Sequence, residues 1–135
     1  MRILAVTLTM AVLALACGTA AAADLTGEWT AVDSWGAGTG HGNHGVFKGD
    51  TWRAEDEWTL RISEQSEDGR AFHGEFCSTK KCEDLVGAVR SDGTILMVDE
   101  DGYLEGRLLG KSMELCYMEA DAGFRVVHCR IMERQ

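Results

Sequence analysis

Cysteine is the residue type with the clearest chemistry in this sequence. Four cysteines follow residue 23, namely Cys77, Cys82, Cys116 and Cys129. If this small domain is exported, an even number of cysteines favours disulfides over a metal site, because the compartments outside the cytosol are oxidising. Cys77 and Cys82 bracket a polar tip and lack the Cys-x-x-Cys spacing of a redox pair. We therefore predict two local disulfides, Cys77 with Cys82 and Cys116 with Cys129.

The second of these pairs follows from a hairpin near the end of the chain. Two runs of alternating apolar residues, 112–120 and 124–132, flank a turn-forming Asp-Ala-Gly. If the turn is a two-residue loop, residues whose numbers sum to 245 lie opposite each other, as Cys116 and Cys129 do. The same register places Tyr117 opposite His128 on the other face, with Glu119 one step further along.

Tyr117 and His128 are the polar pair best placed to meet a ligand. A few polar groups at the end of an apolar pocket are typical of a small-molecule site. The alternative is a tyrosine and a histidine that satisfy each other's hydrogen bonds inside the core. An acid–base role with Glu119 would need shifted pKa values. We expect a binding protein and not an enzyme.

Two histidines at a metal-binding spacing lie in a glycine-rich stretch. His41 and His44 could share a copper, zinc or nickel ion, with Asp50 as a third ligand. No further protein ligand is identified, so we predict neither a metal site nor a cofactor.

The segment 34–57 is too long and too rich in aromatic residues to be only a connection between two strands. It carries Trp35, Phe47 and Trp52. We predict that it covers the open end of the barrel that the strands described below form, with Trp35 and Trp52 against a ligand. The alternative is an exposed aromatic patch for a protein or glycan partner.

Apolar alternation with period two recurs along the rest of the chain and predicts strands. Each turn between them carries the apolar face of one strand onto that of the next, which favours an antiparallel meander. The predicted strands are 25–32, 58–64, 70–77, 82–90, 94–99, 103–109, 112–120 and 124–132. Eight strands can close into an all-β up-and-down barrel with no free edge, and the glycine-rich loop follows the first strand.

The inward face of this barrel contains the apolar residues Phe72, Leu104 and Leu115, which we expect to line the ligand site. It also contains three glycines, Gly74, Gly87 and Gly106. Small residues there either let the sheet bend or leave volume for a ligand.

The first 23 residues have the basic start, apolar run and small-residue end of a secretory signal. The alternative is a lipoprotein signal ending at Cys17, which would add a lipid anchor. Either signal exports a single domain, 24–135, to the bacterial periplasm or the extracellular space. The formal net charge of −9 argues against nucleic acid and anionic lipid as partners, and we expect no membrane insertion.

The opening Leu25-Thr26-Gly27-Glu28-Trp29 resembles the first strand of avidin-like and lipocalin-like barrels, in which a Gly-x-Trp is packed by a basic residue from the chain's end. The resemblance implies this fold and makes Arg130 the candidate for packing on Trp29, with Arg134 second. It implies no ligand. We predict an exported barrel that binds a small apolar or amphipathic molecule at its mouth. The alternatives are a protein-binding module with a filled core, such as an envelope interaction factor or inhibitor, and an enzyme that uses Tyr117 and His128.

Overall fold

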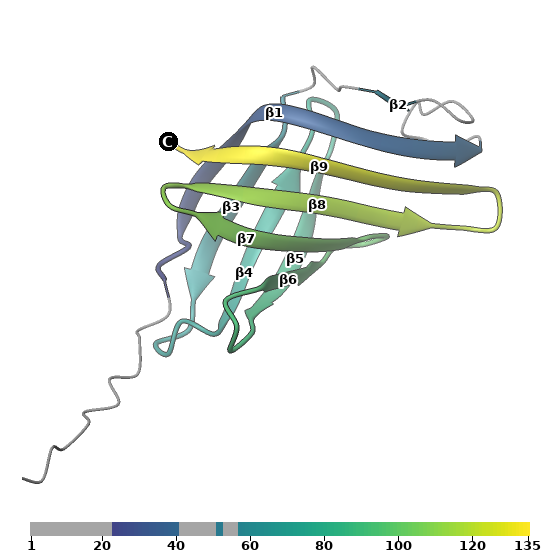
Figure 1. Ribbon diagram of the computed structural model, residues 1–135. Helices are drawn as coiled ribbons and strands as arrows, with labels where there is room; N and C mark the ends of the chain where they lie inside the picture. Colours follow the sequence, from purple (N-terminus) through teal and green to yellow (C-terminus); the bar gives the residue numbers. More distant parts are fainter. Residues whose placement is uncertain (1–22, 41–50, 53–56) are drawn as a thin grey trace, which may run out of the picture.

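The computed structural model describes residues 23–40, 51–52 and 57–135. This part of the chain is all-β and contains no helix. Only the backbone is described at residues 40, 51 and 52. The strands are β1 Gly27–Gly40, β2 Thr51–Trp52, β3 Thr59–Gln65, β4 Ala71–Cys77, β5 Cys82–Val89, β6 Ile95–Val98, β7 Tyr103–Leu109, β8 Ser112–Ala120 and β9 Phe124–Arg134 (Figure 1).

Eight of these strands form one closed antiparallel barrel. The strands β1 and β3 to β9 follow one another around the sheet, and β9 pairs with β1 to close it. The short β2 lies outside this cycle and pairs with Gly36 and Ala37 of β1. The predicted up-and-down barrel is therefore confirmed.

The barrel has two ends, which we call the base and the mouth. The base contains the start of β1, the end of β9 and the turns that join β3 to β4, β5 to β6 and β7 to β8. The mouth contains the turns that join β4 to β5, β6 to β7 and β8 to β9. Figure 1 shows that β8, β9 and the second half of β1 run on past the other strands at the mouth.

Hairpin geometry fixes most of the register, as predicted from the turn lengths. In the β8–β9 hairpin Cys116 pairs with Cys129 and Tyr117 with His128. Both predicted disulfides are present, Cys77–Cys82 and Cys116–Cys129, with Cα atoms 4.0 and 3.9 Å apart.

The first strand is longer than predicted. We expected it to end at Val32, but it continues to Gly40 beside the equally long β9. A bulge between Ala31 and Asp33 shifts the alternation, so that Ser34 points inward and is buried. Gly36, Gly38 and Gly40, three of the glycines that made the segment look like a loop, lie within this strand.

The pairing of β6 with β7 also differs from the prediction, by two residues. Ile95 pairs with Gly106 and Met97 with Leu104, whereas the predicted turn placed these residues opposite Leu108 and Gly106. The turn is longer because the Asp99 carboxylate accepts the Gly102 N–H at 2.7 Å. A shift of two residues keeps each side chain on its predicted face.

The barrel base is closed around Trp29. Its indole N–H donates to the Leu25 carbonyl at 3.0 Å, and both side chains are buried. The prediction that Arg130 packs on Trp29 is wrong. Arg134 does so, with its guanidinium carbon 5.4 Å from the ring centroid, because Arg134 and not Arg130 pairs with Trp29 across the β1–β9 junction. Arg134 also donates to the Thr26 carbonyl.

Candidate functional site

Arg130 lies inside the barrel, toward the mouth. It is 1 % exposed, and its guanidinium carbon lies 4.2 Å from the Trp58 ring centroid and 5.1 Å from that of Phe76. One of its terminal nitrogens lies 2.7 Å from Nδ1 of His128, which is also buried. The indole of Trp58 stacks on Phe76 with ring centroids 5.0 Å apart. A buried guanidinium packed against two aromatic rings is stabilised by cation–π attraction.

Tyr117 forms a second polar group near the mouth. Its hydroxyl lies 2.7 Å from a carboxylate oxygen of Glu119 and 3.0 Å from one of Asp101. Burial, followed by the hydrogen bonds to Glu119 and Asp101, raises the pKa of Tyr117 well above its usual range. A phenol held neutral in this way keeps its one proton, which it can donate to either of the two carboxylates.

Aromatic rings occupy the space above two glycines that face the barrel interior. A Cβ added to Gly87 would lie 2.1 Å from the Phe72 ring, and one added to Gly102 would lie 2.3 Å from the Tyr117 ring. The glycine at 87 therefore makes room for a side chain of the protein itself. Leu104 and Leu115 are buried in the same hydrophobic cluster as Phe72.

A groove of about 610 Å³ opens at the mouth end of β7, β8, β9 and β1. We call it the mouth groove. Most of its lining is apolar or small: Ala37, Gly38, Tyr103, Met118, Ala120, Val126 and Val127. Its polar residues are Thr39, Asp101, Glu119 and Arg125. A cavity of this volume, mostly apolar with a few polar groups at its edge, has the usual constitution of a small-molecule site.

The sheet register explains how the sequence builds this groove. Tyr103 pairs with Met118, Met118 with Val127, and Val127 with Ala37, so four strands contribute one row of side chains. Each member of the row is exposed. At one edge of the groove, Asp101 and Glu119 are the two carboxylates that the Tyr117 hydroxyl contacts.

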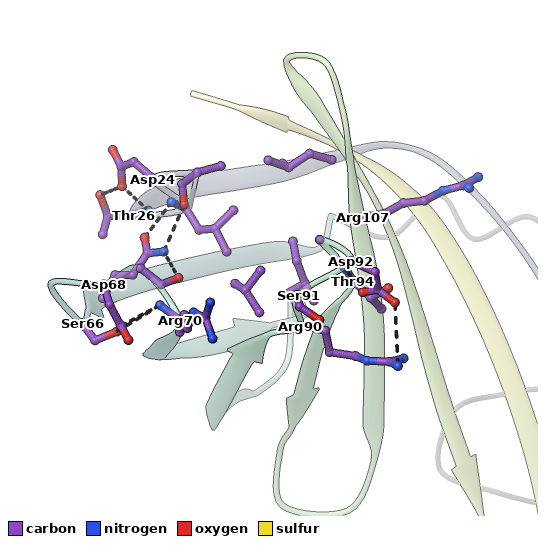
Figure 2. Close-up of a pocket in the computed structure, with 18 of the residues that line it drawn as sticks. Asp24, Thr26, Ser66, Asp68, Arg70, Arg90, Ser91, Asp92, Thr94 and Arg107 are labelled. Carbon is purple, nitrogen blue, oxygen red and sulfur yellow. Dashed lines mark hydrogen bonds and ion pairs between the residues drawn. The ribbon is translucent and has the colours of Figure 1, made fainter. Parts of the chain in front are cut away.

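A larger and more polar groove, of about 1060 Å³, lies at the base (Figure 2). Leu25, Val89, Ile95 and Leu108 contribute its apolar part. Its rim contains Asp24, Asp68, Arg70, Arg90, Asp92 and Arg107.

The aspartates of this base groove accept hydrogen bonds from residues of the neighbouring turns. Hydrogen bonds from the Thr26 hydroxyl, the Ser66 hydroxyl and the Thr94 N–H lower the pKa values of Asp24, Asp68 and Asp92 respectively. Figure 2 shows Arg90 directed toward Asp92, and Arg107 directed away from the other rim residues. The polar groups of the base groove therefore bind neighbouring residues of their own turns and do not point together toward one ligand.

Of the residues predicted to form one site, Tyr117, Phe72, Leu104 and Leu115 lie in one buried cluster, and His128 is paired with Tyr117. Tyr117 and His128 are paired inside the barrel at the mouth, as predicted from the hairpin. Phe72, Leu104 and Leu115 belong to the buried core.

Trp35 lies in β1 opposite Cys129, on the outer side of the barrel, and not in a loop. Trp52 is placed only by its backbone, in β2. His41, His44, Phe47 and Asp50 lie outside the described residues, as does the predicted signal sequence up to residue 22. Trp58, Met118 and Val127 were not predicted as site residues from the sequence. The outward position of Met118 and Val127 in alternating strands was the signal that could have found the groove.

Comparison with protein-family models, with curated proteins and with solved structures found no match to this chain. In the described residues there is no helix of the length and apolarity needed to cross a membrane. The two disulfides are compatible with an exported protein.

Proposed function

We propose that this protein is a non-catalytic, exported binding protein that holds a small amphipathic molecule in the mouth groove. The observation that carries the proposal is the groove itself, with an apolar row on four strands and two carboxylates at its edge. The apolar part of the ligand would lie along Met118, Val127 and Ala37. The polar head would lie toward Asp101 and Glu119.

The charge of the site favours a cationic or hydrogen-bond-donating head group. Asp101 and Glu119 accept hydrogen bonds, and the full chain has a formal charge of −9, which attracts cations. Arg125 lines the same groove and limits the space in which a cation is favoured. The ligand site would thus lie beside the polar pair predicted from sequence, and outside the packed interior that holds Phe72 and Leu115.

Calorimetric titration with two detergents that share a twelve-carbon tail tests this proposal. Dodecyltrimethylammonium and dodecyl sulfate are each added below their critical micelle concentrations. We expect the cationic detergent to bind and the anionic one to bind more weakly. Neutralising the head-group site with Asp101→Asn and Glu119→Gln should reduce this preference.

A matched pair of variants locates the apolar part of the site. Val127→Asn introduces an amide into the mouth groove, whereas Val32→Asn makes the same change at an exposed position of β1 outside it. Burying an unpaired amide against the ligand costs about 1–3 kcal/mol, or roughly a fivefold to 150-fold loss of affinity. Equal affinities of the two variants, or the absence of binding by the wild-type protein, would refute the proposal.

A further inference from the structure

The apolar row of the mouth groove continues from Tyr103 onto the outer face of β6 and β5. Val86 pairs with Val98, and Val98 with Tyr103, which forms one row across the three strands. Ala88 and Leu96 are paired in the next row toward the base. We call these five residues the β5–β7 face.

Four of the five residues of this face are large apolar residues with exposed side chains. Val86, Leu96, Val98 and Tyr103 are 54, 40, 45 and 64 % exposed. A fully exposed aromatic side chain presents about 150–250 Å², and valine and leucine present less, so these four residues together present on the order of 300 Å² of surface. A standard interface buries about 800 Å² on each partner, a little over half of it apolar. The face therefore supplies most of the apolar area that a stable dimer needs.

Charges flank this face in an ordered way along β5. From mouth to base, the outward residues Asp84, Val86 and Ala88 are followed by the exposed Arg90, one residue past the end of β5, so an acid lies at one end and a base at the other. We infer that a second copy of this chain covers the β5–β7 face, related by a two-fold axis that runs across the strands between the two apolar rows. This rotation inverts β5, so that Asp84 of each copy faces Arg90 of the other.

The same rotation places the first apolar row of each copy against the second apolar row of the other copy. Val86 meets the partner's Ala88 and Val98 meets the partner's Leu96, as in two sheets packed with aligned strands. Tyr103 comes opposite the partner's Glu105, the charged residue that shares the second row, and its phenol can donate to that carboxylate.

Two electrostatic effects compete in such a dimer. The net charge of −9 on each chain opposes association, but this repulsion is screened within about 8 Å at physiological ionic strength. Arg90 has an ion pair with Asp92 at 3.7 Å, which is exposed and weak enough to be exchanged for a contact in the interface. The two symmetric Asp84–Arg90 pairs would set the orientation of the copies more than their affinity.

Sedimentation velocity over a range of concentrations tests the inference. We expect the wild-type protein to approach twice the mass of one chain as its concentration rises. Val86→Asp should remain a monomer at every concentration, whereas Val32→Asp should behave as wild type. Val32 is a matched control because it is 55 % exposed, against 54 % for Val86, but lies on β1. A monomeric wild-type protein, or equal behaviour of the two variants, would overturn the inference.

Charge reversal tests the two-fold arrangement separately. Asp84 and Arg90 are six positions apart, about 20 Å along the strand at roughly 3.3 Å per residue, so they interact little within one chain. Asp84→Arg alone and Arg90→Asp alone should each weaken the dimer, because each places like charges opposite each other. An equimolar mixture of these two variants should restore it, since opposite charges then face one another. Failure of the mixture to associate better than either variant would refute this arrangement.

Discussion

The ionisation of Tyr117 gives the sharpest check on the side-chain arrangement at the mouth. In the unfolded chain a tyrosine loses its proton near pH 10. In the folded protein burial and the carboxylates of Glu119 and Asp101 raise the pKa of Tyr117, so the phenol stays neutral at that pH. Above pH 10 the unfolded state therefore binds fewer protons than the folded state, and the free energy of unfolding falls as pH rises.

The magnitude follows from the proton difference alone. One proton corresponds to about 1.4 kcal/mol per pH unit, so Tyr117 should remove about 1.4 kcal/mol of stability between pH 9 and pH 11. Its contribution is fully present below the unfolded pKa and is lost as pH rises toward the folded one. Urea unfolding of the wild-type protein and of Tyr117→Phe at both pH values measures it. The variant should lose about 1.4 kcal/mol less than the wild type over this interval.

The other tyrosine provides the control. The sequence has two tyrosines, so Tyr103→Phe leaves Tyr117 as the one phenol in the chain. Its absorbance at 295 nm should show no phenolate until the protein unfolds in alkali. Phenolate in the folded Tyr103→Phe protein near pH 10, or equal alkaline losses for wild type and Tyr117→Phe, would refute the reasoning.

Two further changes test the packing and the hairpin. Gly87→Ala should destabilise the protein by about 1–3 kcal/mol, because its Cβ would lie 2.1 Å from the Phe72 ring. In contrast, Gly123→Ala has open space and should change the free energy of unfolding by less than about 0.5 kcal/mol in thermal or urea unfolding. Replacing both Cys116 and Cys129 by Ala should cost about 3 kcal/mol, from the loop of sequence separation 13 that the bridge closes, and a loss below about 1 kcal/mol would contradict the chain-entropy argument.

Much of the fold could be predicted because most strands are joined by short hairpins. The length of a short turn fixes which residues lie opposite each other. That rule placed Cys116 against Cys129 across a two-residue turn, and Phe72 against Gly87 across the four-residue tip between Cys77 and Cys82. Alternating polarity then identified the inward side of each strand.

The closing pair of strands could not be predicted in the same way. The strands β1 and β9 are not joined by a turn, so no loop length sets their register, and a bulge near Asp33 shifts it further. This is why Arg134, and not Arg130, packs on Trp29. The continuation of β1 to Gly40 was missed because its glycine-rich composition suggests a loop, whereas the strand is supported by pairing with β9.

The surface features were missed for a related reason. A row of exposed apolar residues can be predicted only when the register of every strand pair between them is known. The predicted β6–β7 pairing would have set Tyr103 against Glu100, whereas the structure pairs it with Val98. An error of two residues leaves each side chain on its correct face, so the inward residues are still predicted. It gives the outward apolar residues the wrong cross-strand partners, so their row is not predicted.

Methionine methyl resonances offer the most direct test of whether the protein binds its ligand in the mouth groove. Met118 lines the groove, whereas Met97, Met113 and Met132 are buried inside the barrel. In protein labelled with ¹³C-methyl methionine and titrated with dodecyltrimethylammonium, the Met118 signal, assigned by its loss in Met118→Leu, should shift while the three interior signals stay in place. A shift of the Met97 or Met113 signal with Met118 unchanged would place the ligand inside the barrel and contradict the account.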